Sequence, residues 1–201
     1  MTFEFIPVWQ QMTPALTREL VAFWREHNAI PDEAAAEQRA AQAVCLVRDE
    51  SGALCGVGTA LLKIIPRLRQ PTYYYRQFFA KSLRGQHQEL PFFQRCKQVL
   101  QQYNAGLQRP ESLGILLEIE NPKIAAAYKR AVEPGFDAVF IGYSPRGLQL
   151  RVSYFEGAVL QPPVRIAAPV AVPRKPRASR RKNTQTLPGT APALITTEKA
   201  P

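Results

Sequence analysis

Residues 1–160 change several times between an alternating apolar pattern and one in which apolar residues recur every three to four positions. The first pattern is typical of strands and the second of one face of a helix. A chain that switches repeatedly between them is predicted to fold as a mixed α/β domain. The expected strands cover residues 3–8, 44–47, 53–62, 73–80, 113–119, 138–141 and 148–154, and the expected helices begin near residues 13, 31, 91 and 121.

Local signals set some of these boundaries. The turn Asp49-Glu50-Ser51-Gly52 lies between two strand patterns and predicts a hairpin. Thr13-Pro14 supplies an N-cap and a first-turn proline for the first helix. The last helix is expected to run from Asn121 through Arg130, with Pro122 at its first position.

The last 41 residues, 161–201, differ in composition from the rest of the chain. They hold eight prolines, eight basic residues and one acid, so +7 of the formal net charge of +10 lies there. Such a segment cannot bury enough apolar surface to offset its ordering entropy, and we expect it to be disordered. The folded domain is therefore predicted to span residues 1–160, and the basic cluster 174–182 is a candidate for non-specific contact with nucleic acid.

Several protein classes do not fit this sequence. No apolar run approaches the roughly 20 residues of a membrane-spanning helix, and the N-terminus lacks the pattern of a signal peptide, so a cytoplasmic protein is expected. Cys45, Cys55 and Cys96 lie in apolar surroundings without metal-site spacing and are predicted to be free, buried thiols. With only two histidines in the chain, no metal site is expected.

The polar, basic segment 81–88 joins an expected strand to a helix that begins near Pro91. The first N–H groups of a helix are unpaired and carry partial positive charge, so an anion such as a diphosphate can bind beside them. The alternative is a solvated strand-to-helix loop with a turn glycine. The candidate anion-binding residues are Arg84, Gly85, Gln86, His87 and Gln88.

Two carboxylates stand at the end of the strand 113–119. Glu118 and Glu120 are two positions apart, so they share one face of the strand. A carboxylate there can take a proton from an ammonium group, directly or through water. The alternatives are that both are surface acids, or that Glu120 favours the N-terminus of the following helix.

Tyr128 follows Asn121 by seven residues, or two helical turns, so the two side chains are expected on similar sides of one helix. A phenol in that position can donate a proton to a leaving thiolate. The alternative is a half-buried tyrosine that serves only packing.

Three stretches carry a family resemblance. Phe78 to Ala80 leads into Arg84-Gly85, Asn121 to Tyr128 is followed by Gly135-Phe136, and Val44 to Ala60 is a hairpin with a charged turn and a Val-Gly pair. Together they resemble the pyrophosphate loop, the Asn-helix-Tyr-Gly-Phe segment and the hairpin of the GNAT superfamily of acyl-CoA-dependent N-acyltransferases. The resemblance spans nearly all of residues 1–160. It implies a mixed, mostly antiparallel twisted sheet of about seven strands flanked by about four helices.

The resemblance also implies an activity, the direct transfer of an acetyl group from acetyl-CoA to an amine of a small molecule or a protein, without a metal. Phe79 and Ala80 would lie beside the pantetheine, Arg84 to Gln88 would cradle the diphosphate, and Asn121 would touch the cofactor arm. Tyr128 would protonate the departing coenzyme A thiolate, and Glu118 or Glu120 would be the base for the amine.

The chain departs from the family pattern in the loop, which usually reads Q/R-x-x-G-x-G/A. His87 and Glu89 stand where small residues are expected, and Pro91 removes a backbone donor. Two alternatives result: the loop still binds acyl-CoA in a shifted form, or the domain is a catalytically inactive binding or interaction module. Gly135-Phe136 also comes three residues later than usual after Tyr128, which predicts an irregular end to the helix.

The basic cluster 174–182 gives a prediction of its own. Deletion of residues 161–201 should abolish retention of the protein on a DNA column at low salt, because the cluster holds most of the excess positive charge. Retention of the full chain should fall steeply as salt is added, since no aromatic residue of the tail is available to stack on a base. Equal retention of the truncated and full-length proteins would show that the cluster does not bind DNA.

Overall fold

The computed structural model describes residues 2–163. Most of the segment 161–201, including the basic cluster 174–182, lies outside the described residues. The disorder expected for this segment and the domain boundary expected near residue 160 therefore stay predictions.

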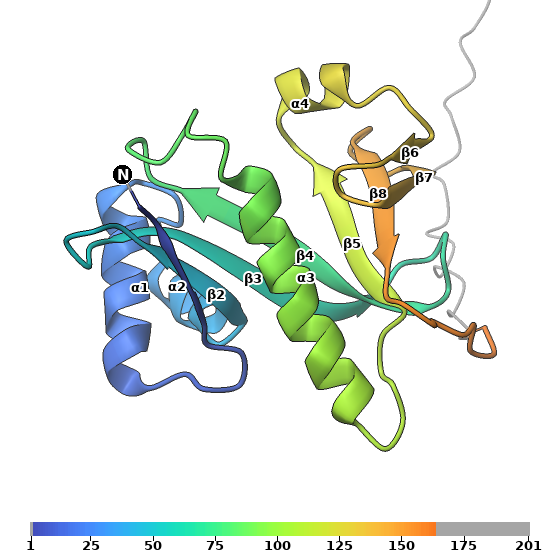
Figure 1. The fold of residues 1–201 in the computed structure, drawn as a ribbon, viewed down its shortest axis with the longest axis horizontal. Helices are drawn as coiled ribbons and strands as arrows, with labels where there is room; N and C mark the ends of the chain where they lie inside the picture. The colour runs from blue at the N-terminus through green and yellow to red at the C-terminus, as the bar shows by residue number, and fades with distance from the viewer. Residues whose placement is uncertain (1, 164–201) are drawn as a thin grey trace, which may run out of the picture. The chain divides into compact units, whose positions relative to one another are not determined.

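The described residues form one eight-stranded sheet with four helices, in agreement with the predicted α/β class (Figure 1). All neighbouring strands are antiparallel except β4 and β5, which are parallel. In spatial order the strands are β1 (Glu4–Pro7), β2 (Ala43–Arg48), β3 (Leu54–Ile64), β4 (Pro71–Phe79), β5 (Gly114–Ile119), β8 (Gln149–Tyr154), β7 (Ala138–Tyr143) and β6 (Val132–Glu133).

The helices are α1 (Pro14–Glu26), α2 (Glu33–Ala40), α3 (Glu89–Gly106) and α4 (Pro122–Ala127). Three of them begin at a capped residue. The side chains of Thr13, Asp32 and Asn121 accept hydrogen bonds from backbone N–H groups of the first turns of α1, α2 and α4. α3 has no side-chain cap, so its first N–H groups are left available to other acceptors.

Neighbouring residues of β4 show which helix covers which face of the sheet. The ring of Phe79 packs on Phe92 of α3, with centroids 5.4 Å apart, whereas Phe78 packs on Phe23 of α1 at 5.6 Å. Successive strand residues point to opposite faces, so α1 and α3 lie on opposite sides of the sheet. Figure 1 shows α3 crossing the face that is turned to the viewer.

The pairing of β4 with β5 is short. It joins Tyr73, Tyr74 and Tyr75 to Ile115, Leu116 and Leu117, whereas β4 continues to Phe79 and β5 to Ile119. Figure 1 shows the two strands separating beyond this point. The split leaves one edge of each strand without a neighbouring strand in the middle of the sheet.

The segment after Asn121 differs from the prediction. The helix ends at Ala127 and not at Arg130, because Tyr128 leaves helical geometry with φ −88° and ψ 76°. The two-residue strand β6 comes next and pairs with β7, which gives one strand more than expected.

Arg151 of β8 holds this irregular segment in place. It is 2% exposed, and its guanidinium donates to the carbonyl oxygens of Tyr128 at 2.7 Å, Arg130 at 3.0 Å and Ala138 at 3.4 Å. A charged donor thus satisfies three carbonyls of the irregular segment and its neighbouring strand. The buried arginine anchors the chain between α4 and β7.

Candidate active site

A cavity of about 1400 Å³ opens where β4 and β5 separate. It is lined from both faces of the sheet: Trp24 and Arg39 come from α1 and α2, whereas Pro91 and Phe93 come from α3. Seven of the predicted site residues line it, namely Phe79, Arg84, His87, Glu118, Glu120, Asn121 and Tyr128. Ala80, Gly85, Gln86 and Gln88 do not line it.

The loop before α3 has unpaired donors. Among the described residues, the backbone N–H groups of Gly85, His87 and Gln88 have no acceptor, whereas those of Leu83, Arg84 and Gln86 donate within the loop. Gly85 and His87 both adopt positive φ, at 79° and 57°. A left-handed residue followed by a right-handed one, as in His87-Gln88, turns successive N–H groups to one side and forms an anion-binding concavity.

Glu89, the first residue of α3, disfavours the binding of an anion in that concavity. Glu89 lines the cavity, so its carboxylate lies near the place an anion would take. The positive end of the helix dipole favours the carboxylate itself. His87 also carries a side chain where a glycine would reach the same φ with less strain.

The free edge of β4 is formed by alternate residues. The N–H of Ala80 donates to Cys55 of β3 at 2.9 Å and its carbonyl accepts from Leu83 at 3.1 Å, so both backbone groups of Ala80 are occupied. By strand alternation, the backbone groups of Gln77 and Phe79 point away from β3 into the split. Gln77 and the N–H of Phe79 can therefore meet an extended ligand, whereas the carbonyl of Phe79 accepts from Arg84 and both backbone groups of Ala80 are occupied.

Arg84 is bent back towards the strand. Its Nε donates to the carbonyl oxygen of Phe79 at 3.1 Å, and its guanidinium lies 5.8 Å from the ring centroid of Phe78. No hydrogen bond of its Nη atoms occurs among the described residues. The Nη donors of the Arg84 guanidinium are therefore available to an anion at the cavity wall.

Glu118 is held by several donors. It accepts from the hydroxyl of Tyr74 at 2.6 Å and forms an ion pair with Arg146 at 2.9 Å, and its side chain is only 10% exposed. Burial by itself raises the pKa of Glu118, but hydrogen bonds from Arg146, Ser144 and Tyr74 outweigh it and lower the pKa to about 2. A carboxylate held this way is a weak acceptor of protons.

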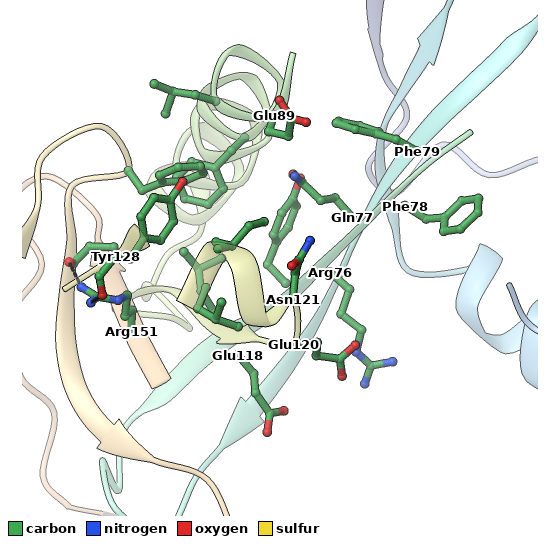
Figure 2. A pocket seen from close by; sticks show the side chains of 18 of the residues that line it. Arg76, Gln77, Phe78, Phe79, Glu89, Glu118, Glu120, Asn121, Tyr128 and Arg151 are labelled. Carbon is green, nitrogen blue, oxygen red and sulfur yellow. Dashed lines mark hydrogen bonds between the residues drawn. The ribbon is translucent and has the colours of Figure 1, made fainter. Parts of the chain in front are cut away.

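Glu120 is less constrained. It accepts one hydrogen bond from Arg146, at 2.8 Å, and its side chain is 63% exposed. One guanidinium, from the turn between β7 and β8, thus bridges both carboxylates. Figure 2 shows Tyr128 on one side of α4 and the two glutamates on the other.

Tyr128 is held by ring contacts and by its backbone N–H, which donates to Ile124 of α4 at 2.9 Å. Its ring lies 5.6 Å from that of Phe136, which lies 5.0 Å from Phe93, which lies 5.6 Å from Tyr75 of β4. This series of rings, here called the aromatic chain, carries Tyr128 to the cavity wall. Burial, with smaller contributions from the carboxylates of Glu133 and Glu89, raises the pKa of Tyr128, so the phenol stays protonated.

Asn121 lies at the N-cap of α4, where its Oδ1 accepts from the N–H of Lys123 at 2.9 Å. Because α4 ends before Tyr128, the expected alignment of Asn121 and Tyr128 along one helix does not occur. Both residues still line the same cavity.

Four residues that shape the site were not predicted from the sequence: Tyr74, Arg76, Arg146 and Arg151 all line the cavity. Arg146 and Arg151 reach it from the last hairpin, so only the antiparallel pairing of β8 with β5 reveals them. Tyr74, Arg76 and Phe78 are two positions apart on the predicted strand 73–80, so their side chains point to the same face of the sheet. This spacing was the one signal in the sequence for Tyr74 and Arg76.

The fold is that of the GNAT acetyltransferases. An acetyltransferase of the GNAT family from Streptococcus pneumoniae matches with a TM-score of 0.52 and 12% identity, over 77% of this chain and 99% of the other. A phosphinothricin acetyltransferase from Sinorhizobium meliloti, solved in complex with AcCoA, matches with a TM-score of 0.51 and 16% identity, over 81% and 94%. No family model and no curated protein sequence matches the chain.

Membrane-spanning and metal-binding features are both absent from the described part of the chain. No helix among residues 2–163 is long and apolar enough to cross a membrane. Within the same residues, no group of three or more His, Cys, Asp and Glu side chains is placed to hold a metal ion.

The low pKa of Glu118 predicts a specific loss of stability in acid. A carboxyl group whose pKa falls from 4.5 to about 2 on folding stabilises the native state above pH 4.5, by at most about 3 kcal/mol after solvent screening, and loses this contribution as the pH falls towards 2. The E118Q variant lacks the ionised group. The difference in unfolding free energy between wild type and E118Q, measured in urea, should therefore shrink between pH 6 and pH 3.

The matched control is E120Q, which removes the neighbouring, exposed carboxylate from the same arginine. It should change stability by less than about 0.5 kcal/mol at both pH values. A wild-type to E118Q difference that stays constant over this pH range would contradict the assigned pKa.

Proposed function

We propose that this protein is an N-acetyltransferase that transfers an acetyl group from acetyl-CoA to an amine. The observation that carries the proposal is the split between β4 and β5, because it places an unpaired strand edge beside a loop with unpaired N–H donors. An extended chain that ends in a diphosphate fits both features: amide groups pair with a strand edge, and phosphate oxygens accept from backbone N–H groups. A structural neighbour of the same fold was solved with AcCoA, which adds support.

The residues that would hold the co-substrate are Gln77 and Phe79 along the strand edge, Arg84 at the loop and His87 through its backbone N–H. The thioester of acetyl-CoA supplies the activated acyl carbon. The chain's contribution is to position the two reactants and to move protons, which is sufficient for direct transfer. In the net reaction an N–C bond forms, the C–S bond breaks, and one proton passes from the amine side to the sulfur side.

Tyr128 is proposed as the acid that protonates the departing thiolate. Its hydroxyl makes no hydrogen bond to other described residues, and its raised pKa keeps the proton in place until the thiolate forms. The carbonyl of Tyr128 is fixed by Arg151, and its ring by the aromatic chain. Such anchoring at both ends is what a general acid requires.

Glu120 is proposed as the proton acceptor for the amine, in preference to Glu118. Glu118 is fully engaged with Tyr74 and Arg146 and has the pKa of a poor base. Glu120 has one partner and reaches water, so it can take a proton and pass it to solvent. The role of Glu118 is then to hold Arg146, which in turn orients Glu120.

The alternative is a domain of this fold that serves only as a binding or interaction module. The observation in its favour is Glu89, whose carboxylate lines the cavity at the N-terminus of α3. Binding of acetyl-CoA decides between the two functions.

Acetyl-CoA binding should be detectable and should depend on the loop. Millimolar acetyl-CoA is expected to raise the unfolding temperature of the full chain by several degrees. R84A should weaken binding about tenfold, because it removes a charged donor, and E89Q should strengthen it about two- to fivefold, because it removes a competing carboxylate. Isothermal titration calorimetry measures both changes.

Lys81→Met is the matched control, since Lys81 is an exposed cation of the same loop that does not line the cavity. It should leave the affinity within about twofold, as surface charges contribute little. If wild type and E89Q both fail to bind acetyl-CoA, the transferase proposal is wrong and the alternative remains.

The roles of Tyr128 and Glu120 predict separate kinetic defects. Y128F should lower kcat about 100-fold with little change in the KM for acetyl-CoA, because only the acid is lost. E120Q should lower kcat most at low pH, where the amine acceptor is protonated and needs a base. Release of free thiol from acetyl-CoA, with a panel of amines, measures both defects.

The control for Y128F is Tyr143→Phe, which removes a hydroxyl from a tyrosine that is 58% exposed and outside the cavity. Its kcat should equal that of wild type. Full activity of Y128F would exclude the tyrosine as the acid, and an unchanged pH profile in E120Q would exclude Glu120 as the base.

A further inference from the structure

Arg76 differs from three other arginines that line the cavity. Arg84, Arg146 and Arg151 each donate hydrogen bonds to oxygen atoms of the protein. The guanidinium of Arg76 lines the same cavity but donates to no acceptor among the described residues, and it forms no ion pair there. It is half-buried and lies 4.6 Å from the ring centroid of Tyr74. A guanidinium held in this way has its full set of planar donors available to a ligand.

Strand parity places Arg76 beside the two glutamates. Tyr74 pairs with Leu116 in the parallel register, so Arg76 and Glu118 project from the same face of the sheet as Tyr74. Figure 2 shows the end of the Arg76 side chain next to Glu120. Among the described residues, the positive group of Arg76 and the negative group of Glu120 thus stand side by side without an ion pair between them.

The two carboxylates that attract Arg76 are already paired with another arginine. Glu118 and Glu120 are bridged by Arg146, and Arg39 of α2 adds another cation to the same cavity. Burial lowers the pKa of Arg76, and the attraction of Glu120 and Glu118 offsets this only in part. An anionic group that bound here would replace lost hydration with two parallel hydrogen bonds.

We infer that the amine acceptor carries an acidic group, which Arg76 binds while the amine lies beside Glu120. The inference rests on the proposed function and names its substrate class: small zwitterionic amines of the amino-acid type. Apolar side chains form the nearby wall, so the body of the acceptor is apolar. The wall residues are Trp24, Ala29, Ile30 and Phe78.

The test compares matched acceptors that differ only in the acidic group. Leucine and methionine are assayed against their carboxamides, with an aminoalkylphosphonate and spermidine as further acceptors, by release of free thiol from acetyl-CoA. Wild type should use each free acid at least about tenfold better, in kcat/KM, than its amide, because the amide has one neutral acceptor oxygen in place of the two charged oxygens that pair with the guanidinium. Preference for the phosphonate over the carboxylates would identify a tetrahedral acid as the recognised group.

Two variants assign the discrimination to Arg76. R76M should lower kcat/KM for the acids about 10- to 100-fold, mainly through KM, and leave the amides within about twofold. R76K should recover part of the loss, since it keeps the charge but not the planar fork. Acetyl-CoA binding and unfolding temperature of both variants should match wild type.

Lys63→Met is the matched control, because Lys63 lies 4.8 Å from the same Tyr74 ring but does not line the cavity. It should keep the wild-type ratio of acid to amide.

Three results overturn the inference: equal use of acids and amides by wild type, an equal effect of R76M on both, or transfer to none of the acids while acetyl-CoA binds. If wild type acetylates spermidine or the amides and Y128F does not, the proposed function still stands. Failure to bind acetyl-CoA would remove both.

Discussion

The short parallel contact between β4 and β5 is the constraint on which the rest of the structure depends. Three residue pairs join the strands, and beyond Tyr75 and Leu117 the sheet opens. Polar residues at the open ends line the cavity: Arg76 and Gln77 of β4 on one side, Glu118 of β5 and Glu120 just after it on the other. The two halves of the sheet are thus joined by the paired residues of β4 and β5, and the unpaired ends of these strands are left for a ligand.

Much of the fold could be predicted from the sequence, because most elements carry their own local signals. Alternation predicted the hairpin β2–β3 and the strand β4, and the cap at Thr13 predicted the beginning of α1. The free, buried state of the three cysteines was also confirmed. An irregular end to α4 was predicted, but its position at Ala127 was not, because the segment is held by Arg151 from more than twenty residues away.

Several residues that the sequence singled out lie at one cavity, but their geometry differs from the expectation. The loop residues Arg84 and His87, the two glutamates and Tyr128 do meet at one cavity. The different states of Glu118 and Glu120 could not be foreseen, because they depend on Arg146 in a distant turn and on Tyr74 in the neighbouring strand. The occupied backbone of Ala80 likewise depends on a long-range partner, Cys55.

The aromatic chain has a consequence for how the cavity responds to strain. Tyr75 is the last residue of β4 that is paired with β5, and from it the rings of Phe93 and Phe136 lead to Tyr128 without a break. Packed rings resist compression and transmit displacement. A ligand that wedges the two strands further apart therefore also moves the phenol, so the width of the opening and the position of the proton donor form one mechanical unit.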